Sequence, residues 1–267
     1  ALAYAKERAQ FGKKIINFPA VYDMLSRMKA KLDAGRSILY QTARYVDIYK
    51  ALEDIARDRT LTPEERKEMK LYSRLADAFT PLAKGMNSEY ANQNAYDAIS
   101  VHGGSGFIME YKCQRLFRDA RIFSIYEGTT QLQVVAAIRY VTNGTYLGII
   151  KEMLEKEVAP EFQALKERVA KMVEKYEDAI NYVKAAGNND LHDFLARRLY
   201  EMTAEIIMSL LIIDDATRAP ALFAKSANVY VRYAEGTVAG HYAYIKEFKA
   251  ENLVDFLAAA PEEAPAE

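Results

Sequence analysis

At the centre of the sequence stands the stretch Arg118-Asp119-Ala120-Arg121-Ile122-Phe123-Ser124-Ile125-Tyr126-Glu127-Gly128-Thr129-Thr130-Gln131. It joins two helical patterns and carries a carboxylate, Glu127, directly behind a run rich in apolar residues. These neighbours are Ile122, Phe123, Ile125 and Tyr126. They predict that the Glu127 carboxylate is partly withdrawn from water, and a carboxylate in that state holds a proton more tightly, as a general base must.

The residues that follow Glu127 are suited to a tight turn and a helix start. Gly128 lets the backbone turn or a ligand approach closely. Thr129 or Thr130 can cap a helix that begins near Gln131, and an exposed helix N-terminus attracts anions. The same residues also fit an ordinary loop and cap with Glu127 in solvent, so local chemistry leaves both interpretations open.

Two further stretches, with the central one, carry a family resemblance. They read Tyr4-Ala5-Lys6-Glu7-Arg8-Ala9-Gln10-Phe11-Gly12-Lys13 and Asp97-Ala98-Ile99-Ser100-Val101-His102-Gly103-Gly104-Ser105-Gly106-Phe107. Together with Arg118-Asp119-Ala120-Arg121 and Tyr126-Glu127-Gly128-Thr129, they resemble the C-terminal helical domain of the acyl-CoA dehydrogenase family. The resemblance covers residues 1 to about 140.

The resemblance implies a reaction of fatty acid metabolism, the α,β-desaturation of an acyl-CoA thioester. Glu127 would remove the α-proton while the β-hydrogen leaves as hydride to the flavin of FAD. The backbone N–H of Glu127 would donate to the developing enolate oxygen, which lowers the barrier to proton removal. Tyr126 and Gly128 would line the path of the acyl chain and thioester.

The resemblance also implies which residues contact FAD. These are Arg8, Gln10, Phe11, Ser100, Val101, His102, Gly103, Gly104, Thr129 and Gln131. Arg8 has the bidentate donors that suit a diphosphate, here that of a flavin held mainly by a neighbouring subunit. Ser100 departs from the family, in which many members carry glutamine there; this removes the side-chain contact and leaves the backbone contacts.

The implied partners are acyl-CoA, an electron-transfer flavoprotein and further copies of the chain in a homo-oligomer that shares flavin sites. Two other domains build the active site in the family, and the resemblance covers neither. We therefore expect this chain alone to be inactive. The alternatives are an acyl-CoA oxidase, an alkylation-response flavoprotein and a purely structural oligomerisation domain, the last being favoured for residues 150–250.

Composition narrows the class of protein. The chain has 267 residues, 51% hydrophobic and 27% charged, with a formal net charge of -1, which gives no general attraction to nucleic acid or anionic membranes. A single cysteine, Cys113, suits a reducing compartment, and we expect a cytoplasmic protein. The three histidines lack metal-ligand spacing, so no metal is expected. The apolar run 206–213 is too short to span a bilayer.

The helical patterns predict an all-α fold. Residues 1–150 are expected to form an up-and-down helical bundle and residues 151–250 a helical extension. Residues 251–267 are rich in proline and glutamate towards their end and are predicted to be a disordered tail.

Local signals place the helix boundaries of the bundle. One helix is expected to end at Gly12, and Pro19 is expected to open the next. Part of 51–68 is predicted to be a surface insertion. Thr62 begins a capping box, and a long helix should follow to about Val101.

In the extension, Pro160 is expected to start a helix that runs to Ala186. Asp190 is the expected cap of the next helix, Leu191–Thr217. A last helix should run toward Ala250.

Overall fold

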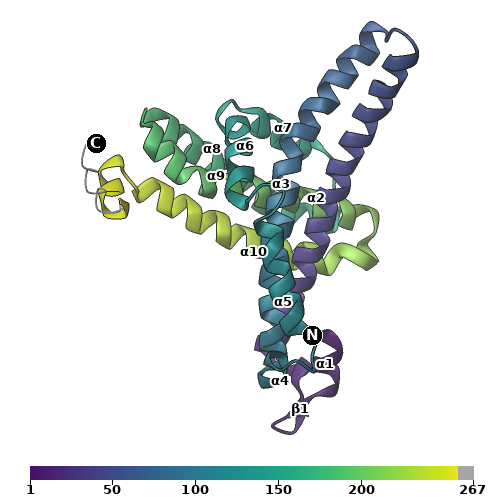
Figure 1. The fold of residues 1–267 in the computed structure, drawn as a ribbon, viewed down its shortest axis with the longest axis vertical. Helices are drawn as coiled ribbons and strands as arrows, with labels where there is room; N and C mark the ends of the chain where they lie inside the picture. The colour runs from purple at the N-terminus through teal and green to yellow at the C-terminus, as the bar shows by residue number, and fades with distance from the viewer. Residues whose placement is uncertain (258–267) are drawn as a thin grey trace, which may run out of the picture.

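Two helices of 40 residues each, α2 (Pro19–Asp58) and α3 (Pro63–His102), form an antiparallel pair along the long axis of the molecule (Figure 1). At 1.5 Å per residue each is about 60 Å long. The computed structural model describes residues 1–257. Its only strands in that range are two short ones, so the predicted all-α fold is confirmed.

The remaining elements follow in chain order. They are α1 (Leu2–Glu7), β1 (Ala9–Gln10), β2 (Lys13–Lys14) and η1 (Ile15–Asn17) before α2, and α4 (Gly104–Phe107), α5 (Cys113–Arg121), η2 (Ile122–Ser124), α6 (Thr130–Thr142), α7 (Thr145–Glu155), η3 (Pro160–Phe162), α8 (Gln163–Ala185), α9 (Asn189–Arg218), α10 (Pro220–Glu247) and η4 (Ala250–Phe256) after α3.

The first turn of the chain differs from the expectation. The first helix ends at Glu7 rather than at Gly12, and a small antiparallel hairpin, β1 with β2, follows it. Phe11 and Gly12 form its two-residue turn with φ values of +48° and +78°. Two consecutive left-handed residues are the backbone that a tight hairpin turn requires, and glycine supplies one of them without strain.

The predicted insertion within 51–68 is helical for most of its length. Residues 51–58 continue α2, and α3 begins at Pro63, so this segment belongs to an arm of both helices that projects from the body (Figure 1). The predicted capping box is confirmed, because the Thr62 hydroxyl accepts from the Glu65 N–H and the Glu65 carboxylate accepts from the Thr62 N–H. The cap starts α3 only four residues after α2 ends.

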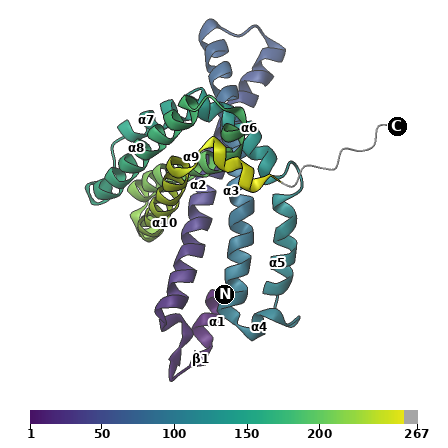
Figure 2. The same ribbon diagram turned by 90° about the vertical axis from the view of Figure 1, so that its left-hand side faces the viewer.

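Helix α9 lies at the centre of the core. Its apolar run 206–213 is buried throughout, and it packs against α2, α3, α6, α7, α8 and α10. Helices α8 to α10 lie across the α2–α3 pair (Figures 1 and 2). Bundle and extension therefore share one hydrophobic core, because α9 buries its apolar face on helices of both parts.

The helices α8 to α10 begin and end close to the expected positions, with two differences in the extension. Asn188, not Asp190, caps α9, and its Oδ1 accepts from the Leu191 N–H at 2.9 Å. The predicted tail begins with an ordered piece, since residues 251–256 belong to η4, where Phe256 packs against Phe194 and Phe248. The rest of the predicted tail, 258–267, lies outside the described residues.

Candidate active site

Eight of the ten expected cofactor residues line one hollow of about 550 Å³ at the lower end of the molecule. They are Arg8, Gln10, Phe11, Ser100, Val101, His102, Gly103 and Gly104. The hollow lies where α1 and the hairpin meet the C-terminal end of α3 (Figure 2). Segments about 90 residues apart in sequence are thus brought together as the resemblance implies.

A small second core holds these segments in place. Ala5, Ile15 and Val101 are buried together. The Tyr4 ring stacks on His102, with 4.4 Å between the ring centres, and the Tyr4 hydroxyl lies 3.3 Å from the hydroxyl oxygen of Ser105. This packing fixes α1, which precedes Arg8, against the end of α3.

The side chains and backbone of the hollow suit a cofactor that carries a phosphate and an aromatic ring. Arg8 supplies an exposed guanidinium, and the Phe11 ring is 93% exposed at the hairpin turn. Gly103 has φ of +60°, and a side chain at Gly103 or Gly104 would meet no atom within 4 Å. The Gly103 N–H donates to the Ser100 carbonyl at 3.2 Å, and the space beside both glycines lets a ligand approach the backbone. The Ser100 hydroxyl instead turns back to the Tyr96 carbonyl of its own helix at 3.3 Å.

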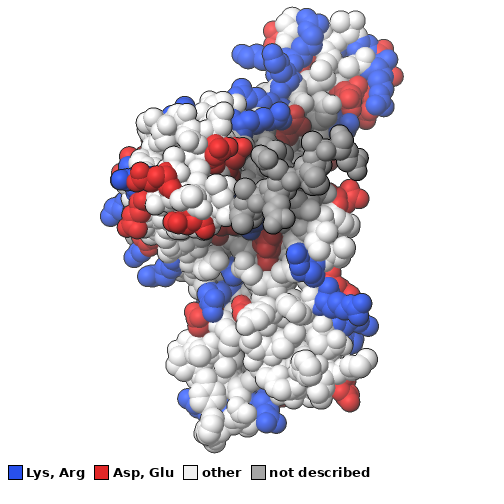
Figure 3. Space-filling model, turned by 60° about the vertical axis from the view of Figure 1, so that its left-hand side comes forward, with Lys and Arg blue, Asp and Glu red and all other residues white. Residues whose placement is uncertain are grey.

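The surface around the hollow differs from the arm. Figure 3 shows charged side chains gathered on the projecting end of α2 and α3 and few on the opposite end. Apolar side chains are prominent at that lower end, where Phe107 and Met109 are 82% and 87% exposed. Exposed apolar side chains that cluster in this way are typical of a surface that binds a ligand or another protein.

The second group of expected site residues lies at the far end of α5. Glu127 has φ of +53° and Gly128 has φ of +84°, so two successive residues are left-handed. Thr129 then caps α6, since its hydroxyl accepts from the Leu132 N–H at 3.2 Å. A non-glycine residue in this conformation is strained, and such strain persists only where surrounding contacts impose it.

Lys84 of α3 supplies those contacts. Its ammonium group donates to the backbone carbonyls of Phe123, Tyr126 and Gly128, at 2.8, 2.9 and 2.6 Å. The three carbonyls stand on both sides of Glu127, so one cation holds the entry and the exit of the turn. A charged donor makes these bonds stronger than neutral ones.

Gln133 of α6 closes the turn from the other side. Its amide nitrogen donates to the Gly128 carbonyl at 3.1 Å and lies 3.5 Å from the Glu127 carbonyl. A side chain at position 128 would come within 2.8 Å of that nitrogen. Glycine at 128 therefore suits the left-handed backbone, and a side chain there would displace the Gln133 amide from its place.

The expected desolvation of Glu127 is wrong for this chain. The Glu127 side chain is exposed, and the four apolar neighbours point outward, between 40% and 48% exposed. Because η2 and the turn hold the backbone against α3, these side chains form an open apolar rim beside the carboxylate instead of a cover over it. Water would be excluded only by something that binds to the rim.

The ten expected cofactor residues therefore fall into two places. Thr129 and Gln131 stand at the start of α6, whereas the other eight line the hollow beside α4 (Figure 2). Helix α5 separates them; its nine residues span about 14 Å. No group of three His, Cys, Asp or Glu side chains arranged to hold a metal ion is found in residues 1–257. Within the same range, no helix combines the length and apolar character that a membrane crossing requires.

Two models of known protein domains match this sequence in succession. "Acyl-CoA dehydrogenase, C-terminal domain" matches residues 1–141, more than half of the chain, and "Acyl-CoA dehydrogenase C terminal" matches residues 142–253. The chain belongs to the acyl-CoA dehydrogenase family. The resemblance drawn from four short motifs is thereby confirmed.

Similarity to individual relatives supports membership of the acyl-CoA dehydrogenase family. The chain is 37% identical over 133 residues to the CarC subunit of the caffeyl-CoA reductase–Etf complex of Acetobacterium woodii, and 34% identical over 133 residues to a 3-(aryl)acrylate reductase of Clostridium sporogenes. Each match covers 50% of this chain and 29% of the relative. The chain thus spans less than a third of the length of these relatives.

A solved structure extends the likeness in fold to the whole chain. The acyl-CoA dehydrogenase of Bacillus anthracis superposes with a TM-score of 0.68 at 21% identity, over 97% of this chain and 46% of that one. The likeness at this identity is one of fold. It includes helices α8 to α10, because it covers 97% of this chain.

Sequence reasoning missed the residues that hold the Glu127 turn in this acyl-CoA dehydrogenase chain. Lys84 lies 39 to 44 positions from the carbonyls it binds, so no local pattern indicates the contact. The one available signal is a lysine among positions that are otherwise buried, since Leu82, Ala83, Gly85 and Met86 all belong to the core face. A cation in such a place must have fixed acceptors.

Proposed function

We propose that this chain is the C-terminal part of an FAD-dependent acyl-CoA dehydrogenase in which Glu127 is the base. The observation that carries the proposal is the strained turn: an exposed carboxylate at φ +53°, held from both sides by Lys84 and Gln133. Backbone strain that is supported in this way is typical of functional sites. An ordinary helix cap would need Thr129 but not the strained carboxylate.

The residues of the turn divide the work of proton removal. The Glu127 carboxylate takes the proton from the α-carbon of the thioester, and its backbone N–H donates to the thioester oxygen. Tyr126 and Gly128 line the path of the acyl chain. The open rim of apolar side chains then receives the acyl chain or another domain, and either would exclude water from the carboxylate.

A flavin, when bound, accepts the β-hydrogen as hydride. Arg8 and the backbone at Gly103 and Gly104 would hold a diphosphate, and Thr129 and Gln131 would hold a second flavin at the other end of α5. We propose that the two groups serve different flavins in a homo-oligomer, since they lie apart on one chain. The Bacillus anthracis structure, similar in fold, is a complex with FAD, which supports this choice of cofactor.

The relatives suggest a second candidate, the same chemistry in the reducing direction. The two relatives described above are named as reductases, one of them in a complex with Etf. In that direction a protonated Glu127 would return its proton to the α-carbon. An electron-transfer flavoprotein is the proposed redox partner in either direction, and a cytoplasmic location is proposed from the single cysteine.

The test uses the longest natural polypeptide that carries this chain, mixed without oxygen with a series of acyl-CoA thioesters. Flavin bleaching is followed in the wild type, in Glu127→Gln and in Glu155→Gln, an exposed glutamate on α7. Bleaching should collapse only in Glu127→Gln, with flavin still bound. Equal bleaching in all three proteins would contradict the assignment of the base.

Further arms of the experiment separate the alternatives. Reoxidation of a reduced flavin by enoyl-CoA thioesters, without bleaching by saturated ones, would favour the reductase. Rapid reoxidation by oxygen would favour an acyl-CoA oxidase, and bound flavin with no response to any thioester would favour an alkylation-response relative. If the purified polypeptide binds no flavin, the remaining interpretation is a structural oligomerisation domain. Residues 1–267 tested by themselves are expected to be inactive.

A further inference from the structure

The turn that carries Glu127 is tied to the extension through α3. Thr130, the first residue of α6, is buried, and its hydroxyl donates to Glu89 Oε1 at 2.6 Å. Glu89 lies on α3, five residues after Lys84. Helix α3 thus holds the turn at two points, through the carbonyls before α6 and through the first side chain of α6.

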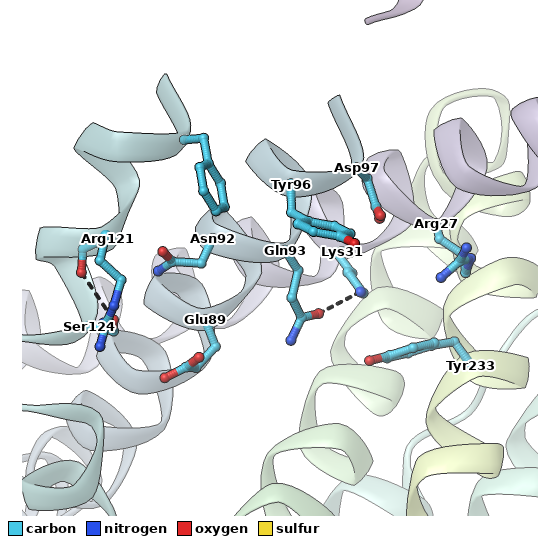
Figure 4. Close-up of a pocket in the computed structure, with 11 residues that line it drawn as sticks. Arg27, Lys31, Glu89, Asn92, Gln93, Tyr96, Asp97, Arg121, Ser124 and Tyr233 are labelled. Atoms are coloured by element: carbon cyan, nitrogen blue, oxygen red, sulfur yellow. Dashed lines mark hydrogen bonds between the residues drawn. The ribbon is translucent and has the colours of Figure 1, made fainter. Parts of the chain in front are cut away.

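Burial does not fix the orientation of the Glu89 side chain. Its side chain is 28% exposed and borders a hollow of about 650 Å³ between α2, α3, α5 and α10. Figure 4 shows Glu89, Arg121 and Ser124 on one side of this hollow and Tyr233 and Arg27 on the other. Because the hollow leaves room on that side, the carboxylate depends on its bonding partners for its orientation.

One of those partners comes from the extension. Arg197 of α9 places Nη2 3.8 Å from Glu89 Oε1, the oxygen that accepts from Thr130. Arg197 is itself held by Glu201 one turn further along α9, with 2.5 Å between Nε and Oε1. The other oxygen of Glu201 lies 2.8 Å from Nε2 of His241 on α10. A line of polar and charged side chains therefore runs from α10 through α9 and α3 to the start of α6.

The packing of α9 on α3 reinforces this line. Tyr200 of α9 lies against Gly85, so closely that a side chain there would collide with its hydroxyl oxygen. The same hydroxyl donates to the Pro81 carbonyl at 2.9 Å. Gly85 directly follows Lys84, so α9 contacts the very turn of α3 that holds the carbonyls around Glu127.

We propose that Arg197 and Tyr200 of the extension are positioning residues for the Glu127 turn, acting through Glu89 and Lys84 of α3. The inference rests on the proposed function and gives the extension a role in the reaction beyond packing. It also explains why the extension shares a core with the bundle, because a loosely tethered domain would not hold these contacts in register.

The first test measures the turn itself and needs no substrate. Amide hydrogen exchange of peptides covering 123–133 is compared in the full-length wild type, Arg197→Met and Arg168→Met. Arg168 makes an equivalent ion pair, 2.6 Å from Glu235, but on α8, away from the turn. Exchange should rise in Arg197→Met alone. No change in Arg197→Met, or an equal rise in both variants, would overturn the proposal whatever reaction the enzyme catalyses.

The second test measures flavin reduction by a thioester in the same proteins. A positioning role predicts a rate at saturating substrate roughly tenfold lower in Arg197→Met, with the half-saturating concentration unchanged and partial recovery in Arg197→Lys. The double variant Arg197→Met with Glu89→Gln should reduce flavin only slightly more slowly than Arg197→Met, because both changes break the same contact between Arg197 and Glu89. Fully additive losses would contradict the link. If the rate of flavin reduction collapses in Glu127→Gln but is unchanged in Arg197→Met, this inference is wrong while Glu127 remains the proposed base.

Discussion

Glu127 shows how one strained residue depends on one distant cation. A left-handed backbone at a non-glycine residue costs roughly 1–3 kcal/mol, and the three bonds from Lys84 offset that cost.

We expect Lys84→Met to release the turn and slow flavin reduction about 100-fold, as a displacement near 1 Å does. Stopped-flow bleaching measures this. Lys151→Met, which removes an exposed pair with Glu177, is the control and should react normally.

A buried carboxylate in the core sets a dependence of stability on pH. Glu205 of α9 is 1% exposed; burial raises its pKa to about 7, against a hydrogen bond from Tyr90 at 2.7 Å that lowers it. Its second oxygen has no partner among the described residues, so the folded protein prefers the neutral carboxyl. A pKa raised above the unfolded value of 4.5 means that stability is lost as pH rises from about 4.5 to about 7.

The change in the free energy of unfolding over that window is about 3 kcal/mol for this group. Glu205→Gln keeps an acceptor for Tyr90 and cannot ionise. We expect denaturant unfolding of the variant to lack this part of the decline between pH 5 and pH 8. Identical pH profiles for variant and wild type would contradict the assignment.

Among the elements, the projecting arm of α2 and α3 depends most on local interactions. The capping box at Thr62 starts α3, and Arg59 binds the same Glu65 carboxylate at 2.6 and 2.8 Å. Thr62→Ala should destabilise the arm by about 1 kcal/mol. Amide exchange near residue 62 should rise while the melting temperature of the body stays unchanged. Thr60→Ala, at an exposed position outside the cap, is the control and should leave exchange as it is.

At the scale of the whole molecule, the shared core makes the two parts interdependent. Removal of all residues after 141 would strip α9 from α3 and expose Phe79 and Leu82, which are both fully buried. We expect the remaining residues 1–141 to lose cooperative thermal unfolding and to bind a hydrophobic dye, because apolar area of this size cannot stay in water. A sharp unfolding transition for 1–141 alone would show that the bundle folds independently.

The sequence by itself determined the all-α fold, the cap at Thr62 and the family, and it narrowed the cap of α6 to Thr129 or Thr130, because helix periodicity, capping and short motifs depend on residues a few positions apart. It also named the residues that line the lower hollow. The tertiary structure alone decided what holds Glu127 and how exposed it is, since Lys84 and Glu89 reach the turn and the start of α6 from α3. Contacts over 40 to 115 positions, such as Lys84 to Tyr126 or Tyr90 to Glu205, form only when packing brings the helices together, and no local pattern encodes them.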